Sequence, residues 1–180
     1  ELALGLAHAE TEQQPYFLPV IAYYGTNRAI REEVQRRRGF KKKFSRFDAL
    51  SGALESDARF RSAFEWFNAM EDAERREQKE RRDFDYKDPD LEIVRNAIER
   101  VLPSFKNPRT EIRPLRFVID HAAPSGQSRT LRISQLSDGY RIVLGVVMDL
   151  ARRMTEANSR GLPLSQQGIN PLDLPAIALI

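Results

Sequence analysis

One short turn, Ser134-Gln-Leu-Ser-Asp-Gly-Tyr-Arg141, has the residue types best suited to hold an anion. Ser137 is a candidate N-cap for the helix that follows, and Gly139 has no side chain to obstruct a ligand that approaches the backbone N–H groups. The unpaired amides and the positive end of the helix dipole favour a phosphate group there. The same residues are also ordinary capping and turn chemistry, so the turn by itself leaves both interpretations open.

The elements around this turn are predicted from hydrophobic periodicity. Thr130 to Ser134 alternates apolar and polar residues, which is typical of a half-buried strand. The turn-rich residues 155–173 precede an apolar run, Leu174 to Ile180, that is typical of a strand buried on both faces. Between the Ser134–Arg141 turn and residue 155, apolar residues on more than one face predict a helix that is buried on most sides. These residues are Ile142, Val143, Leu144, Val146, Val147, Leu150, Ala151 and Met154.

A further strand is predicted near the N-terminus, from Phe17 to Tyr24, and Gly25 ends it. Asn27 and Arg28 follow that strand. Because ligands of open α/β sheets gather beyond the carboxyl ends of the strands, both are candidates for contact with a nucleotide or a neighbouring subunit. The alternative is that Arg28 lies on a solvated loop.

Four segments in this order resemble a bacterial family of predicted ATP-binding proteins of the ABC class. That family is similar to the ATPase heads of structural-maintenance-of-chromosomes and RecF-type proteins and to the ATPases of Septu-type and retron-associated phage defence. The resemblance implies an α/β fold, a partial P-loop NTPase head with an inserted helical subdomain. The segments are Val20-Ile-Ala-Tyr-Tyr-Gly-Thr-Asn-Arg28, Leu136-Ser-Asp-Gly-Tyr-Arg141, Met148-Asp-Leu-Ala-Arg-Arg153 and Pro175-Ala-Ile-Ala-Leu-Ile180.

The resemblance also implies roles for the turn. Ser137 and Gly139 would donate hydrogen bonds to the γ-phosphate of ATP held by the opposite subunit, and Asp138 and Tyr140 would shape the turn. The complete protein would bind ATP and Mg²⁺, form a homodimer through ATP, and control an effector, which the family suggests is a nuclease acting on nucleic acid.

Two motifs of the family do not occur in the 180 residues. There is no Gly-x-x-x-x-Gly-Lys-Ser/Thr loop, and no acidic pair follows Ile180. We therefore expect a fragment that spans the interval between the two Walker motifs and does not hydrolyse ATP by itself. Leu2 to Ala7 resembles the end of the helix after a Walker A loop, which agrees with this expectation. The alternative is a degenerate head that kept only the signature turn.

Composition limits the remaining classes of function. With 180 residues and 41% hydrophobic content, one domain over residues 1–180 is expected. The chain has no Cys and two isolated His, so we expect no metal site in it and no bound zinc. Apolar runs fall short of the roughly 20 residues that span a bilayer, so we expect a cytoplasmic protein without membrane contact.

A basic segment, residues 28–46, supports a second function, a non-enzymatic module that binds nucleic acid or protein. Its cations would contact phosphate groups, although an exposed polar connection is the simpler interpretation. A third possibility is an unrelated α/β domain in which Ser137 is merely a cap. The candidate nucleic-acid contacts are Arg36, Arg37, Arg38, Lys41, Lys42 and Lys43.

Residues 45–102 are predicted to form the helical insertion between the α/β parts, residues 1–44 and 103–180. Phe60, Phe64 and Phe67 recur at helical spacing, whereas residues 71–82 are polar all round and predict a solvated helix or projecting arm. Asp88 followed by Pro89 starts another helix, which should end before Pro103. Residues 112–119 predict a strand whose partner is 130–134.

Overall fold

The computed structural model describes residues 16–25, 44–55, 60–122, 126–159 and 168–180. Asn27, Arg28 and the basic residues from Arg36 to Lys43 lie outside these ranges. The elements follow in the order β1 (Val20–Tyr23), η1 (Arg46–Leu50), α2 (Phe60–Arg81), α3 (Pro89–Val101), β2 (Phe105–Ile112), β3 (Leu115–Ala122), β4 (Ser128–Arg132), η2 (Ile133–Gln135), α4 (Asp138–Asn158), η3 (Pro171–Asp173) and β5 (Ala176–Leu179).

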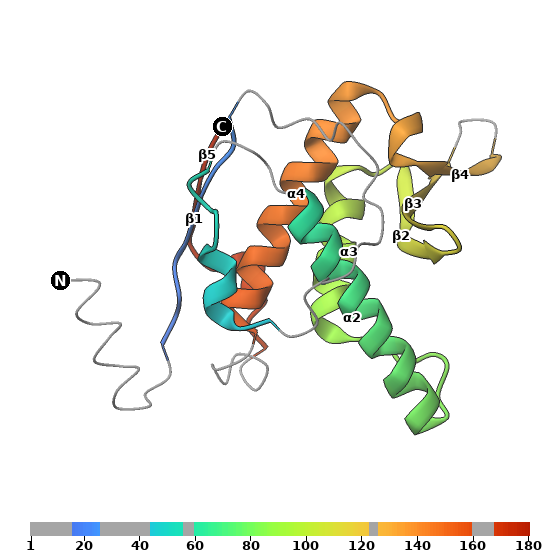
Figure 1. Ribbon diagram of the computed structural model, residues 1–180, viewed down its shortest axis with the longest axis horizontal. Helices are drawn as coiled ribbons and strands as arrows, with labels where there is room; N and C mark the ends of the chain where they lie inside the picture. The colour runs from blue at the N-terminus through green and yellow to red at the C-terminus, as the bar shows by residue number, and fades with distance from the viewer. Residues whose placement is uncertain (1–15, 26–43, 56–59, 123–125, 160–167) are drawn as a thin grey trace.

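Two small sheets lie on opposite sides of α4 (Figure 1). β1 and β5 pair in parallel, with Val20 opposite Ala176 and Tyr23 opposite Leu179. β2, β3 and β4 form an antiparallel sheet in that order. Helices together with one parallel and one antiparallel sheet make the chain an α/β protein, as the sequence predicts.

The main core lies between α2, α3, α4 and the inner face of the antiparallel sheet. The aromatic stripe of α2 is buried as its spacing predicts, and Phe67 meets Phe117 of β3 edge to face, with ring centroids 5.4 Å apart. Asp88 caps α3 by accepting hydrogen bonds from the N–H groups of Asp90 and Leu91, both at 3.0 Å. Pro89 occupies the first turn and the helix ends at Val101, so this prediction is confirmed.

The charged segment after Met70 differs from the predicted solvated helix or projecting arm. It continues α2 to Arg81, but it is not solvated all round, because the side chains of Glu71 and Glu74 are buried. Arg95 of α3 donates to Glu71 at 3.0 Å and to Glu74 at 3.0 Å, and the N–H of Thr110 in β2 donates to Glu71 at 2.9 Å. Periodicity within one helix does not reveal these partners, which come from other elements.

The antiparallel sheet has a strand that the sequence analysis missed. Ile112 ends β2, and the chain reverses before Leu115 begins β3, so residues 112–119 are not one strand. β2 contains Pro108 and several charged residues, which weakens any strand signal. The predicted partner strand, residues 130–134, is present with different bounds. β4 spans Ser128–Arg132 and pairs with β3, whereas Ile133 and Ser134 belong to η2.

The two predicted strands near the ends of the chain are present as β1 and β5, but β5 is not buried on both faces as predicted. Ile177 and Leu179 are 54% and 52% exposed, because β1 is the one strand that pairs with β5 among the described residues. α4 is longer than predicted and ends at Asn158, where its side chain holds the backbone of Leu18. Within the described part of the chain, no helix is long and apolar enough to cross a membrane.

Candidate nucleotide-contact site

The turn before α4 has the geometry of an N-cap, which confirms the prediction for Ser137. Its backbone is extended, with φ −63° and ψ 159°, and its hydroxyl accepts a hydrogen bond from the N–H of Tyr140 at 3.5 Å. The backbone carbonyl of Ser137 accepts the N–H of Arg141 at 2.9 Å and so begins the helical ladder. Ser137 to Tyr140 are all exposed, so the start of α4 is open to solvent.

The residues that follow Ser137 do not obstruct the solvent-facing side of the turn. A Cβ atom at Gly139 would meet no other group within 4 Å, so the space beside its backbone is open. Asp138 forms an ion pair with Arg141, which balances the negative charge of the turn. The ring of Tyr140 packs edge to face on Phe105, with centroids 4.9 Å apart, and holds the turn against β2.

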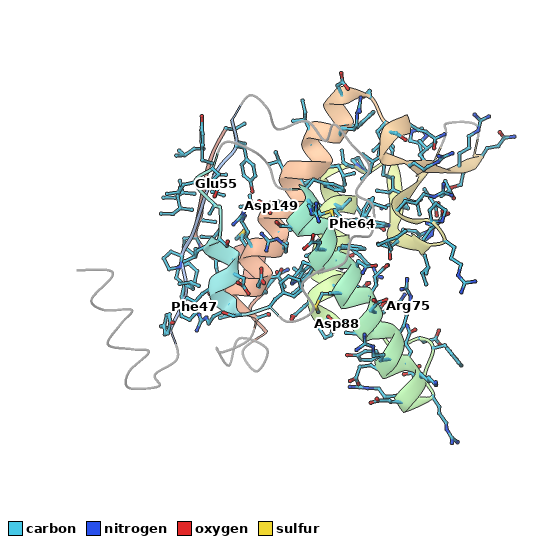
Figure 2. The ribbon with its side chains drawn as sticks, viewed as in Figure 1. Phe47, Glu55, Phe64, Arg75, Asp88 and Asp149 are labelled. Carbon is cyan, nitrogen blue, oxygen red and sulfur yellow. The ribbon has the colours of Figure 1, made fainter. Side chains whose placement is uncertain are left out.

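The other half of α4 is anchored by a buried polar network, which we call the Asp149 network: Tyr24, Asp149, Arg152, Arg153 and Glu156. Asp149, which Figure 2 shows beside α4 toward the β1–β5 pair, is 1% exposed. One of its oxygens accepts the hydroxyl of Tyr24 at 3.0 Å and Nε of Arg153 at 2.6 Å, and the other accepts Arg152 at 3.0 Å. Arg152 also donates to Glu156 at 2.5 Å.

Further contacts extend this anchor to two other segments. Arg153 donates to the backbone carbonyl of Ala49 at 2.5 Å and to that of Ser51 at 3.0 Å. The amide of Asn158 accepts the N–H of Leu18 at 2.9 Å and donates to its carbonyl at 3.1 Å. α4 is therefore fixed against the segment before β1, against the end of β1, and against the turn after η1.

The structure brings together two segments that sequence reasoning had linked only through the family resemblance. Tyr24 comes from the first of the four segments, and Asp149 and Arg153 come from the third. Their contact was missed, yet a signal exists: Asp149, Arg152, Arg153 and Glu156 recur at helical spacing within an otherwise apolar helix. Such a polar row on a buried helix indicates partners elsewhere in the fold.

The phenol of Tyr24 should resist ionisation. Burial raises its pKa far above 10, and the negative charge of Asp149 raises it further. The phenol of a tyrosine in an unfolded chain has a pKa near 10. The stability that folding gains from the neutral phenol of Tyr24 is therefore complete below pH 10 and is lost as the pH rises further. In ultraviolet titrations of the wild type and of Tyr24→Phe, we expect the difference between the two proteins, which reports the phenol of Tyr24, to appear only on unfolding. A difference that appears while the chain is still folded would contradict the burial of Tyr24.

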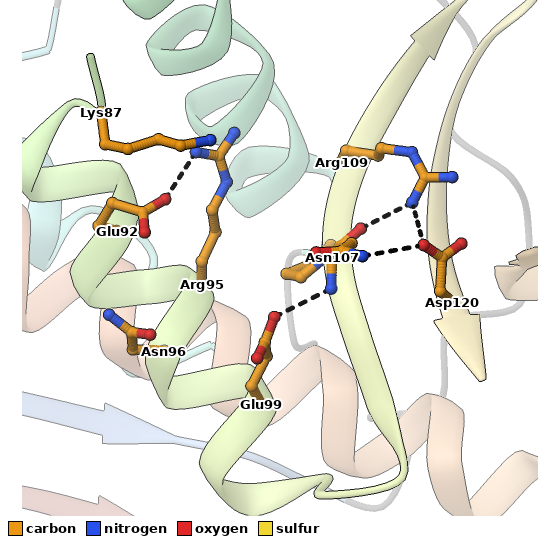
Figure 3. Close-up of a pocket in the computed structure, with 9 residues that line it drawn as sticks. Lys87, Glu92, Arg95, Asn96, Glu99, Asn107, Arg109 and Asp120 are labelled. Carbon is orange, nitrogen blue, oxygen red and sulfur yellow. Dashed lines mark hydrogen bonds and ion pairs between the residues drawn. The ribbon is translucent and has the colours of Figure 1, made fainter. Parts of the chain in front are cut away.

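A polar cavity of about 500 Å³ lies apart from the turn, between α3 and β2 (Figure 3). Each of its carboxylates is already paired: Glu92 with Arg95, Glu99 with Lys106 and Asp120 with Arg109, at 2.8, 3.0 and 3.0 Å. The cavity thus joins α3 to the antiparallel sheet with balanced charge, and none of the predicted site residues lines it. Its lining residues are Lys87, Glu92, Arg95, Asn96, Glu99, Asn107, Pro108, Arg109 and Asp120.

The backbone at this cavity is held in an irregular shape. A register shift in β2 lies between Lys106 and Arg109, and Asn107 has a φ of 52°. The N–H of Asn107 donates to Glu99 at 2.9 Å, and its side chain donates to Asp120 at 3.2 Å. Partial burial raises the pKa of Asp120, but hydrogen bonds from Thr130, Asn107 and Arg109 outweigh it, and the pKa lies below its usual value.

Neither the turn nor the cavity offers a metal centre. Within the described ranges, no three His, Cys, Asp or Glu side chains gather closely enough to hold a metal ion. His121 lies in β3 rather than in a loop, with its ring centroid 4.9 Å from that of Phe105. Mg²⁺ for nucleotide chemistry would need ligands outside this set.

Comparison with known proteins gives a similarity to part of a larger protein. No protein-family model matches the chain. Over 90 residues, half of this chain, the sequence is 32% identical to the Retron Ec83 probable ATPase of Escherichia coli. The match covers 14% of that protein, so the chain corresponds to a small part of its length.

Proposed function

We propose that this chain is the part of an ATP-hydrolysing head that contacts the terminal phosphate of ATP bound by another protomer. The observation that carries the proposal is the turn of Ser137 to Tyr140, which is exposed, capped by serine and open beside Gly139. The similarity to a probable ATPase supports the same class of function.

The chemistry of the turn fits a phosphate. The hydroxyl of Ser137 and the N–H of Gly139 would donate to phosphate oxygens, and hydrogen bonds to a charged acceptor are shorter and stronger than neutral ones. The positive end of the dipole of α4, which has 21 residues, adds to the attraction. Arg141 keeps the carboxylate of Asp138 paired, and Tyr140 holds the turn on Phe105.

ATP and Mg²⁺ would be held mainly by a phosphate-binding loop and an acidic pair outside the 180 residues. When bound, ATP would supply the scissile phosphoanhydride, and Mg²⁺ would neutralise the negative charge that develops on the phosphate oxygens. The role of this chain is to complete the site from the opposite protomer, which makes a homodimer the active form. Closure of that dimer would control an effector such as a nuclease, and the cytoplasm would be its compartment.

The test replaces Ser137 in a protein that carries this chain together with a phosphate-binding loop. Ser137→Arg places a bulky side chain in the turn, and Ser137→Asp keeps an equally good N-cap but repels phosphate. We expect both variants to bind ATP at the protomer's own loop, to lose ATP-dependent dimerisation, and to lose turnover by about 100-fold.

The control is Ser128→Arg, which introduces the same charge at an exposed position of β4. It should keep both dimerisation and turnover. Unchanged ATPase activity in Ser137→Arg and Ser137→Asp would overturn the proposed role of the turn.

A further inference from the structure

The Asp149 network joins the end of β1 to the helix that begins at the turn of Ser137 to Tyr140. Tyr24 directly follows β1, one residue before Gly25, and the hydroxyl of Tyr24 reaches Asp149 in the middle of α4. α4 begins at the turn, and the eleven helical steps from Asp138 to Asp149 span about 17 Å. A helix of this length moves as a rod, so its contact with Tyr24 sets where the turn lies relative to the end of β1.

Buried charge of this kind is a costly way to stabilise a core, because apolar residues of similar volume often serve as well. The hydrogen bonds of the network are directional, which apolar contacts are not. Asp149 accepts hydrogen bonds from Tyr24, Arg152 and Arg153. Arg153 also donates to two backbone carbonyls in residues 49–51. These bonds can be satisfied together in one placement of α4 against β1 and the turn after η1. The network can thereby specify the register of α4, which is the best-attested use of buried polar groups.

We infer that Tyr24 and Asp149 are positioning residues that hold the turn of Ser137 to Tyr140 in register with the end of β1. The inference rests on the proposed function, because it assigns the network a task in presenting that turn to a phosphate. The end of β1 and the turn then act as one rigid unit. The network transmits any displacement of the β1 end to the start of α4.

The hydroxyl of Tyr24 is the part of the network that can be removed with the least damage. Its ring is 2% exposed and packs in the core, and Asp149 keeps both arginines when the hydroxyl is lost. Tyr24→Phe therefore removes one hydrogen bond and retains the ring. Tyr23→Phe is a matched control, because Tyr23 is the adjacent residue on β1 and its side chain faces outward, 41% exposed.

The first measurement uses the chain by itself, which has no Cys and therefore accepts labels at chosen sites. Spin labels on Leu54→Cys, beside β1, and Ser134→Cys, before the turn, report the distance between the two regions. We expect Tyr24→Phe to broaden or shift the distance distribution, and Tyr23→Phe to leave it unchanged. Identical distributions in all three proteins would overturn the inference whatever the fate of the proposed function.

The second measurement uses a protein that contains a phosphate-binding loop. Tyr24→Phe should lower kcat about tenfold, since small misplacements of a reacting group are costly, while KM for ATP stays within about twofold. Its Tm should fall by a few degrees. Wild-type kcat in Tyr24→Phe, with Ser137→Arg inactive, would overturn the positioning role alone; wild-type kcat in both would overturn the proposed function as well.

Discussion

Replacing Asp149 with asparagine is expected to lower the free energy of unfolding by about 3–5 kcal/mol, the range for breaking a buried ion pair by removing one partner. The substitution keeps the shape of the side chain and removes its charge. Arg152 and Arg153, both nearly inaccessible to solvent, would then lose the carboxylate they share at 3.0 and 2.6 Å. Arg152 would keep Glu156 as a partner, whereas the ion pair of Arg153 with Asp149 would be lost.

Asp72→Asn is the matched control for this experiment. Asp72 makes an ion pair with Arg75 at 3.3 Å, and both side chains are partly exposed to solvent, so its loss should cost less than about 1 kcal/mol. Urea unfolding followed by circular dichroism measures both variants. A loss below about 1 kcal/mol for Asp149→Asn would show that the network does not bear on the stability of the fold.

Glu71→Ala is expected to have the next largest effect, a loss of about 3 kcal/mol. Glu71 is 2% exposed and accepts hydrogen bonds from Arg95, from Arg75 and from the N–H and hydroxyl of Thr110. Its removal leaves the buried N–H of Thr110 without an acceptor and takes one carboxylate from Arg95. Arg95 keeps Glu74 and Glu92, which limits the loss.

Glu77→Ala on the same helix provides the comparison. Glu77 pairs with Arg81 at 2.9 Å in solvent, and such pairs contribute about 0.3–0.5 kcal/mol. Thermal unfolding of both variants measures the difference in Tm. Equal shifts in Tm would mean that Glu71 contributes no more to stability than a surface charge. They would contradict the burial of Glu71 in α2.

Local sequence signals predicted those parts of the fold that local interactions determine. The cap at Asp88, the cap at Ser137 and the aromatic stripe of α2 each depend on residues within one or two helical turns. β5 shows the limit of this reasoning. Its composition predicts a strand, but how far it is buried depends on what pairs with it and covers it.

In the candidate site, too, local features could be predicted from the sequence and long-range contacts could not. The turn of Ser137 to Tyr140 was predicted because capping residues and glycine identify a helix start. The contact between Tyr24 and Asp149 joins residues 125 positions apart, and that between Glu71 and Thr110 joins residues 39 positions apart. One sequence shows the row of charges in each helix, but it does not show which distant group each charge meets.

The central claim is that the turn of one protomer completes the ATP site of another. The most direct measurement is the mass in solution, by light scattering, of a protein that carries this chain and a phosphate-binding loop, with and without ATP under conditions that block hydrolysis. We expect a dimer with ATP and a monomer without it, and a monomer in both conditions for Ser137→Asp. A Ser137→Asp protein that dimerises with ATP as the wild type does would contradict the account.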